Sequence, residues 1–219
     1  MNWPFYVARD EGWFAAAGIE VIETIYPATT GAVTALLEGR LDVAHVIPDR
    51  ELPSPLRVVA RVLDRPTYRL FGRPGRVGVS TADSGDGPLV RLLLRHLGVH
   101  GDLVPANGPA ARVAALLAGR IDATMVTEPF TFTLDDAGIP LLGDLCQALP
   151  DFPFALCVVS GAGPRGLDTY LDVLRRARER LRDPAAAGIL ATATGCSPAT
   201  AERVRRLYLR DGHLGRFDP

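Results

Sequence analysis

One segment of this chain occurs twice, and this repeat constrains the fold more than any other feature of the sequence. Residues 33–42 read VTALLEGRLD, and residues 113–122 read VAALLAGRID, with Val, Ala, Leu, Leu, Gly, Arg and Asp in register. Each copy has the pattern of an amphipathic helix that ends at a left-handed Gly, followed by an apolar strand that Asp opens. The chain therefore contains two similar α/β units. Two such units side by side leave a cleft of the kind in which small molecules bind.

Composition excludes several classes of function. The chain has 219 residues, of which 47% are hydrophobic, so it is long enough to bury an ordinary core. Its formal charge is −1 and the charges are interspersed, which excludes a basic nucleic-acid-binding face. All 24 basic side chains are Arg, and the absence of Lys excludes Schiff-base chemistry and a pyridoxal phosphate enzyme. We expect no cofactor.

The Cys and His residues predict neither a disulfide framework nor a metal site. Cys146, Cys157 and Cys196 lack CxxC spacing, and no His pair has the spacing of metal ligands. Cys157 lies in an apolar run and is expected to be a small core residue. The sequence begins without a signal-peptide pattern and has no stretch long enough for a membrane span. We expect a cytoplasmic protein as written, and an extracytoplasmic one if the N-terminus is truncated.

The apolar pattern predicts two βαβ-like units with mainly parallel strands. For the first unit, it predicts a helix over 6–17, a half-buried strand over 19–25, the first repeat helix and a strand over 41–46. The second unit is predicted to contain strand 76–80, helix 88–97, strand 102–105, the second repeat helix and strand 121–126. The β-rich segments 57–76 and 154–160 connect the units, and the chain is predicted to be helical from Leu167 on. Asp42 and Asp122 open the repeat strands, where a bond to backbone is the expected role.

Four segments together resemble a known family. Residues 5–14 (FYVARDEGWF), 18–21 (GIEV), 36–44 (LLEGRLDVA) and 127–129 (TEP) are similar to the ABC-transporter substrate-binding proteins of the nitrate, taurine, alkanesulfonate and thiamine-pyrimidine group. The resemblance runs from about residue 3 to about residue 210. It implies an α/β, two-lobed type II periplasmic-binding-protein-like fold with a double hinge. Residues 1–72 and 160–219, which include the C-terminal helices, are expected to form lobe 1, and residues 73–159, with the hinge strands, lobe 2.

The chain departs from the family at its start. Members usually carry a signal peptide and a first core strand before the Trp-Pro-Phe-Tyr region, and this chain begins too late for either. We therefore expect lobe 1 to lack its first strand. A sheet that lacks a strand exposes an edge, which predicts either a homodimer through that edge or low stability.

Three loops carry the small polar residues expected at a cleft between the lobes. They contain the candidate ligand-binding residues Thr29, Thr30 and Gly31, then Ser80, Thr81 and Ser84, and finally Asn107. Helix N-termini after such loops offer free N–H groups that favour anions. The same residue types also serve as ordinary helix caps. Asp83 and Asp86 argue against a strongly anionic ligand at the second loop unless both point outward.

Four larger side chains complete the candidate site. Trp3 and Phe5, which the sequence places before the first helix, either stack on a ligand or belong to the core. His45 lies near the end of a predicted core strand, where it either contacts a ligand, carries a proton or is structural. Glu128 precedes Pro129 and either accepts an N–H from a ligand or caps the loop.

The leading hypothesis is a solute-binding protein that captures a small polar or heteroaromatic molecule, anions included, in an interlobe cleft for an ABC importer. Its expected partners are that ligand and an ABC permease. An alternative is a cytosolic enzyme on the same scaffold, of the decarboxylase or desulfinase, pyrimidine-precursor synthesis or dehydratase type, with His45 and Glu128 handling protons. A third is a ligand-sensing module without its output domain.

Overall fold

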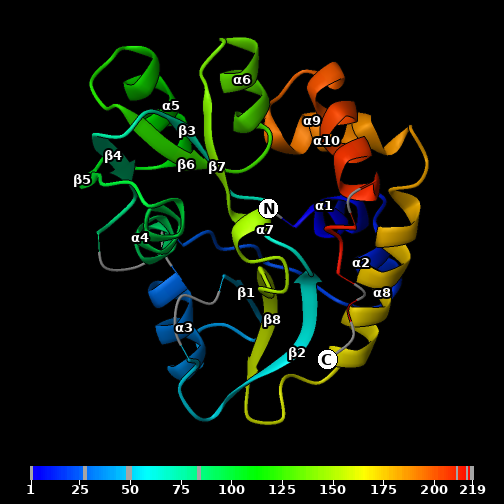
Figure 1. The fold of residues 1–219 in the computed structure, drawn as a ribbon. Coiled ribbons are helices and arrows are strands. Elements are labelled where there is room, and N and C mark those ends of the chain that lie inside the picture. The colour runs from blue at the N-terminus through cyan, green and yellow to red at the C-terminus, as the bar shows by residue number, and fades with distance from the viewer. Residues whose placement is uncertain are drawn as a thin grey trace.

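The computed structural model describes residues 2–26, 29–47, 51–82, 85–210, 212–215 and 217 (Figure 1). The helices are α1 (Trp3–Asp10), α2 (Trp13–Ala16), α3 (Thr29–Leu37), α4 (Asp86–Leu97), α5 (Pro109–Leu117), α6 (Phe130–Asp136), α7 (Leu145–Ala148), α8 (Leu167–Arg180), α9 (Ala186–Thr194) and α10 (Pro198–Arg210). The strands are β1 (Ala44–Val46), β2 (Leu56–Leu63), β3 (Arg69–Gly72), β4 (Arg76–Val79), β5 (Asp102–Pro105), β6 (Ala123–Val126), β7 (Leu141–Asp144) and β8 (Ala155–Ser160). In the described ranges, none of the helices combines the length and apolar character needed to span a bilayer.

The strands form two sheets. The three-stranded sheet has the order β1-β8-β2, and the five-stranded sheet has the order β5-β4-β6-β3-β7. We call each sheet with its attached helices the three-stranded unit and the five-stranded unit. The mixed α/β architecture confirms the predicted fold class. Strand β3 pairs in the five-stranded sheet and β8 in the three-stranded one, and the lobe boundaries at 72/73 and 159/160 stay predictions.

The predicted parallel direction is correct for β4, β5 and β6, but β3 is antiparallel to both β6 and β7 in the same sheet. Strand β4 is parallel to both β5 and β6, as βαβ units require. Strand β8, however, is antiparallel to both β1 and β2. The expectation of mainly parallel strands is therefore wrong for the three-stranded unit, because its central strand returns from a distant part of the chain.

The two repeat helices end in the same way. Gly39 after α3 and Gly119 after α5 both have φ of 69°, the left-handed conformation that the sequence predicts. In each case the N–H of the residue after the glycine donates to a carbonyl in the last turn of the helix. Arg40 N donates to Ala35 O at 2.8 Å, and Arg120 N donates to the equivalent Ala115 O at 2.9 Å. The repeat thus has the same local structure in both units.

Asp122 makes the backbone bond that was expected of it. Its Oδ2 accepts from Arg76 N at 2.8 Å and from Arg76 Nε at 3.1 Å. These bonds lower the pKa of Asp122. The second repeat strand is thereby fixed to the start of β4.

Two predicted elements near the N-terminus differ from the structure. The helix expected over 6–17 is two helices, because Gly12 between α1 and α2 adopts φ of 69°. The strand expected over 19–25 does not form, since residues 19–26 pair with no strand in the part of the chain that the structure describes. Ile22 and Ile25 there are each 81% exposed. An alternating pattern makes a strand only where a neighbouring strand supplies hydrogen bonds.

Helices α1, α2, α8, α9 and α10 gather on one side of the molecule, with α9 and α10 at the upper right near α6 (Figure 1). Beyond α10, the C-terminal tail runs along the outer edge of β2. Gly215 N donates to Val62 O at 2.9 Å, and Phe217 N donates to Arg61 O at 3.2 Å. The tail thus covers an edge that would otherwise be open to another chain. Cys157 in β8 is fully buried, as the sequence predicts.

We predict that Gly215→Ala detaches this tail. A Cβ at Gly215 would lie 2.0 Å from Arg61 O, so either the tail or β2 must move. We expect a loss of about 1–3 kcal/mol of unfolding free energy, as for other overpacked sites, and faster amide exchange in β2. Gly188→Ala in α9 is the matched control, because a Cβ there meets nothing within 4 Å. Equal melting temperatures for the two variants would contradict the prediction.

Candidate functional site

His45 is held by two side chains from distant parts of the chain. Its Nδ1 contacts Asn2 Nδ2, and its Nε2 lies 3.3 Å from Tyr170 OH. Asn2 caps α1, with its Oδ1 accepting from Phe5 N at 3.3 Å, so its amide group is left to face His45. An amide nitrogen only donates, which makes Nδ1 the acceptor and assigns the proton to Nε2.

This arrangement keeps His45 neutral. Burial lowers the pKa of His45 to about 4, because the imidazolium would lose hydration. Protonation at Nδ1 would also place a second donor against the Asn2 amide. Both ring nitrogens are thus occupied by structural partners, an arrangement that disfavours the proton-carrying role.

The start of α3 lies against the end of β1. Thr29 Oγ1 donates to Ile47 O at 3.0 Å, two residues beyond His45. Thr30 in the same first turn is exposed, and Gly31 lies against the Tyr26 ring. The predicted residues Thr29, Thr30 and His45 therefore share one end of the three-stranded unit.

The second loop is organised around an ion pair that sequence reasoning missed. Arg112 on α5 and Asp86 on α4 are each 2% exposed at the side chain, with Nη2 and Oδ2 2.9 Å apart. Ser80 joins both, since its N–H donates to Asp86 Oδ1 at 2.9 Å and its Oγ accepts from Arg112 Nη1 at 2.9 Å. The carbonyl oxygen of Asn107, whose φ is 61°, also accepts a hydrogen bond from Arg112 Nη1 at 2.9 Å.

This pair changes the argument about anions. Asp86 points inward and its charge is matched by Arg112, so it no longer opposes an anionic ligand at the loop. Thr81 is exposed beside Ser80, while Asp83 and Ser84 lie outside the described residues. One signal was present in the sequence: Arg112 lies on the inward face of the second repeat helix, where the first copy has Ala32.

Glu128 is buried between the β6–α6 loop and the C-terminal helix. It is 1% exposed, and its two oxygens lie 3.5 Å from Thr131 Oγ1 and from Tyr208 OH. Burial raises the pKa of Glu128 to about 7, although the positive charge of Arg69 acts in the opposite direction. At neutral pH the carboxyl is therefore about half protonated.

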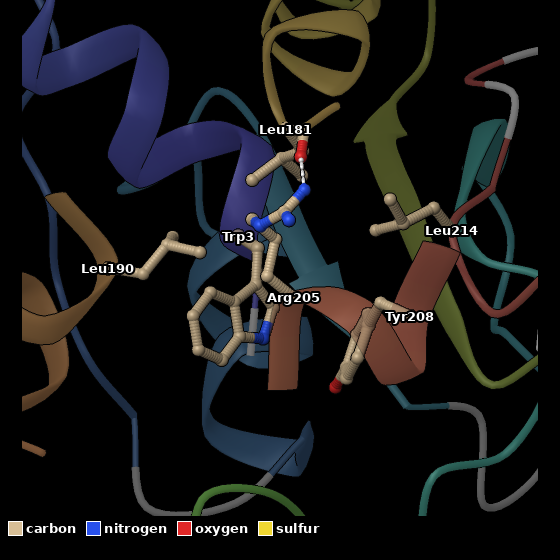
Figure 2. A pocket seen from close by; sticks show the side chains of 6 residues that line it. All are labelled: Trp3, Leu181, Leu190, Arg205, Tyr208 and Leu214. Carbon is tan, nitrogen blue, oxygen red and sulfur yellow. Dashed lines mark hydrogen bonds between the residues drawn. The ribbon is translucent and has the colours of Figure 1, made fainter. Parts of the chain in front are cut away.

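Trp3 and Phe5 lie inside α1 and in the core, so the expectation that they precede the first helix is wrong. The Trp3 ring packs at 5.8 Å from the ring of Tyr208, as Figure 2 shows, and Phe5 packs at 5.6 Å from Phe14. Trp3 is 1% exposed and Phe5 8%. Their contact with a ligand stays a prediction.

Two small cavities lie beside α10. One, of about 10 Å³, is lined by Trp3, Leu181, Leu190, Arg205, Tyr208 and Leu214 (Figure 2). It holds at most one water molecule. The other, of about 70 Å³, borders Arg178 and Arg182. Neither approaches the several hundred Å³ of a typical ligand pocket.

The structure thus gathers the predicted residues into two groups. Asn2, next to Trp3, contacts His45, and Tyr208 connects Trp3 to Glu128, so residues from both units meet around the start of α1. Ser80 and Asn107 form the second group around Arg112. Sequence reasoning missed Asn2, Arg112, Tyr170 and Tyr208. Besides the signal for Arg112 given above, Asn2 had one, since Asn followed by Trp-Pro has the pattern of a helix N-cap.

Comparison with known proteins gives a family and a fold. The family model described as NMT1/THI5 like matches residues 2–141. No curated protein matches the sequence. A structure from Bordetella bronchiseptica RB50 superposes with a TM-score of 0.78 at 20% identity, covering 99% of this chain and 79% of that one.

Two further structures are similar in fold. The alkanesulfonate-binding protein SsuA from Xanthomonas axonopodis pv. citri, bound to MOPS, has a TM-score of 0.67 at 17% identity and covers 93% of this chain and 79% of its own. A Candida albicans protein with the generic periplasmic binding protein fold has a TM-score of 0.67 at 12% identity. The superposition covers 93% of this chain and 76% of that one. These similarities confirm the expected fold.

Proposed function

The chain belongs to the NMT1/THI5-like family, and from that premise we propose that it is a solute-binding protein that supplies a small molecule to an ABC importer. The family match over residues 2–141 carries this proposal. Its likeness over 93% of the chain to an alkanesulfonate-binding protein supports it. The enzyme alternative receives no such support, and His45 is held neutral by structural partners.

The proposed ligand is a small polar or heteroaromatic molecule, with anions included, bound between the two units. Thr29 and Thr30 at the start of α3 and His45 at the end of β1 would form one wall. Ser80, Thr81 and Asn107 would form the other, and Ser84, which the sequence also predicts there, lies outside the described residues. The ion pair of Asp86 with Arg112 removes the objection to an anion, because it neutralises a carboxylate next to Ser80.

Native mass spectrometry of the full chain, purified without added ligand, tests this function. We expect a small-molecule adduct that is lost on unfolding, or a raised melting temperature with alkanesulfonates or pyrimidines. Thr30→Glu should weaken the binding of an anionic ligand, because it places a carboxylate at the first turn of α3. Thr34→Glu is the control, because it is exposed one turn further along the same helix. No adduct and no thermal shift, or turnover of an added candidate, would contradict the proposal.

We also propose a homodimer, which the sequence predicts through an exposed sheet edge, and we place its contact at residues 19–26, outside both sheets. This segment pairs with none of the described strands, and Ile22 and Ile25 are each 81% exposed. In an antiparallel register with Ile22 opposite its own copy, no glutamate faces another glutamate. Glu23 is also neutralised within the chain by Arg9 at 2.6 Å. A two-fold axis through Ile22 would therefore pair the two segments without charge repulsion.

Light scattering after size-exclusion chromatography tests the dimer. We expect a dimer for the unaltered chain and a monomer for Ile22→Lys, because two lysines would face each other at the axis. Leu117→Lys replaces a 50% exposed leucine outside the segment and should leave the dimer intact. A monomeric unaltered chain would exclude this contact.

A further inference from the structure

Helix α10 is anchored to the elements beside the three-stranded unit. Arg205 Nη1 donates to Leu181 O at 2.9 Å and to Arg182 O at 3.1 Å, at the end of α8 (Figure 2). Val204 and Leu207 are buried in the core cluster that contains α1, α8 and α9 and that also extends into the five-stranded sheet. The tail that follows α10 pairs with β2. These contacts involve backbone and core, so α10 moves with this part of the molecule.

Two side chains of α10 reach across to the five-stranded unit. Arg203 Nη1 lies 3.0 and 2.8 Å from the carboxylate oxygens of Asp136, and its guanidinium lies 4.1 Å from the centre of the Phe132 ring. Tyr208 OH donates to Glu128 Oε2 at 3.5 Å. All three partners belong to the stretch 128–136, which comprises α6 and the loop before it.

Two chain crossings also join the units, which share one hydrophobic core cluster. These are the segments between β2 and β3, residues 64–68, and between β7 and β8, residues 145–154. Crossings of this kind act as hinges in two-part binding proteins. A rotation about them changes the distance between α6 and α10. The contacts of Arg203 and Tyr208 must then break or shift.

We propose that α10 is a latch between the two units. Arg203 and Tyr208 hold the 128–136 segment against α10 and thereby set the ratio of the arrangement described here to more open arrangements. The latch is made of side chains alone, so it is broken without unfolding either unit. The inference goes beyond the proposed function, since it depends on no particular solute.

Distances between spin labels test the latch in the full chain without added ligand. Exposed Thr133 on α6 and exposed Thr169 on α8 are replaced by Cys for labelling. Cys146 and Cys196 are replaced by Ser, and the buried Cys157 is kept. We expect Arg203→Ala combined with Tyr208→Phe to raise the ratio of longer to original distances about tenfold, which corresponds to the loss of a hydrogen bond and a cation–π contact.

Two further variants make the result decisive. Arg206 lies on the same helix, and Arg206→Ala removes only its ion pair with Glu202. The distances between the two spin labels in this variant should therefore match those in the unaltered chain. Asp136→Ala removes the ion pair from the other side, so it should give part of the effect of Arg203→Ala, and adding it to Arg203→Ala should cause no further change. Retained amide protection in α8 to α10 excludes unfolding as the cause. Identical distance distributions in all variants would overturn the latch, whether or not the protein binds a solute.

Discussion

Replacing Arg112 by Met should lower the free energy of unfolding by about 3–5 kcal/mol, because it leaves a buried carboxylate without its counter-charge. Asp86 is 2% exposed at the side chain, and Arg112 Nη2 is its partner at 2.9 Å. The guanidinium also donates to Thr124 Oγ1 at 3.1 Å and to Met125 O at 3.2 Å. The variant therefore leaves several buried acceptors without a donor at once. Urea unfolding with the linear extrapolation measures the loss.

Two control variants distinguish the loss of the ion pair from a general effect of substitution in or near α5. Arg120→Met changes an exposed arginine just beyond the same repeat helix and should alter stability by less than about 0.5 kcal/mol. Arg112→Met combined with Asp86→Leu should recover only the part of the loss that comes from the unpaired carboxylate, because Thr124 Oγ1 and Met125 O still lack their donor. A single Arg112→Met variant within about 1 kcal/mol of the unaltered chain would refute the assigned role.

Glu128→Gln should stabilise the protein above about pH 7. The pKa of Glu128 is raised to about 7 from 4.5, so the folded state holds a proton that the unfolded state releases. The stability that this carboxyl contributes is complete below about pH 4.5 and is lost as the pH rises to about 7. The shift corresponds to about 3 kcal/mol. Gln mimics the neutral acid, so the gain should be absent near pH 4 and full near pH 8.

His45 has the opposite pH dependence. Its pKa is lowered to about 4 from 6.5, so the unfolded state gains a proton first as the pH falls. Its contribution is complete above about pH 6.5 and is lost as the pH falls to about 4. Between about pH 4.5 and 6.5 the opposite pH dependences of Glu128 and His45 cancel. The unfolding free energy of the unaltered chain should therefore change little with pH from these two groups.

Urea unfolding at a series of pH values tests both assignments. Glu128→Gln removes the pH dependence of the carboxyl and leaves that of His45. The unfolding free energy of this variant should therefore fall by about 3 kcal/mol as the pH drops from about 6.5 to 4. His45→Phe combined with Glu128→Gln should remove this fall, because no titrating group is left at either position. Parallel profiles for the unaltered chain and Glu128→Gln would show that the carboxyl is not buried as described.

The repeat was predictable because its signals are local. Gly39 and Gly119 end their helices as the sequence indicates, since a left-handed cap depends only on the adjacent turn. The pattern over 19–25 was equally clear, but a strand also needs a neighbour, which no local pattern supplies. His45 was correctly placed in a short strand. Its partner Tyr170 is distant in sequence, and no spacing rule predicts such a contact.

The strand order of the three-stranded sheet also has a consequence for synthesis on the ribosome. The five-stranded sheet is built from one continuous stretch, from β3 to β7, and is able to form as that stretch emerges. Strands β1 and β2, by contrast, emerge long before their shared neighbour β8, and the tail that covers β2 comes later still. The first part of the chain to be made is therefore among the last to fold. Nascent β1 and β2, like α1, whose partners α8 and α9 emerge later still, leave a chaperone a long time to bind.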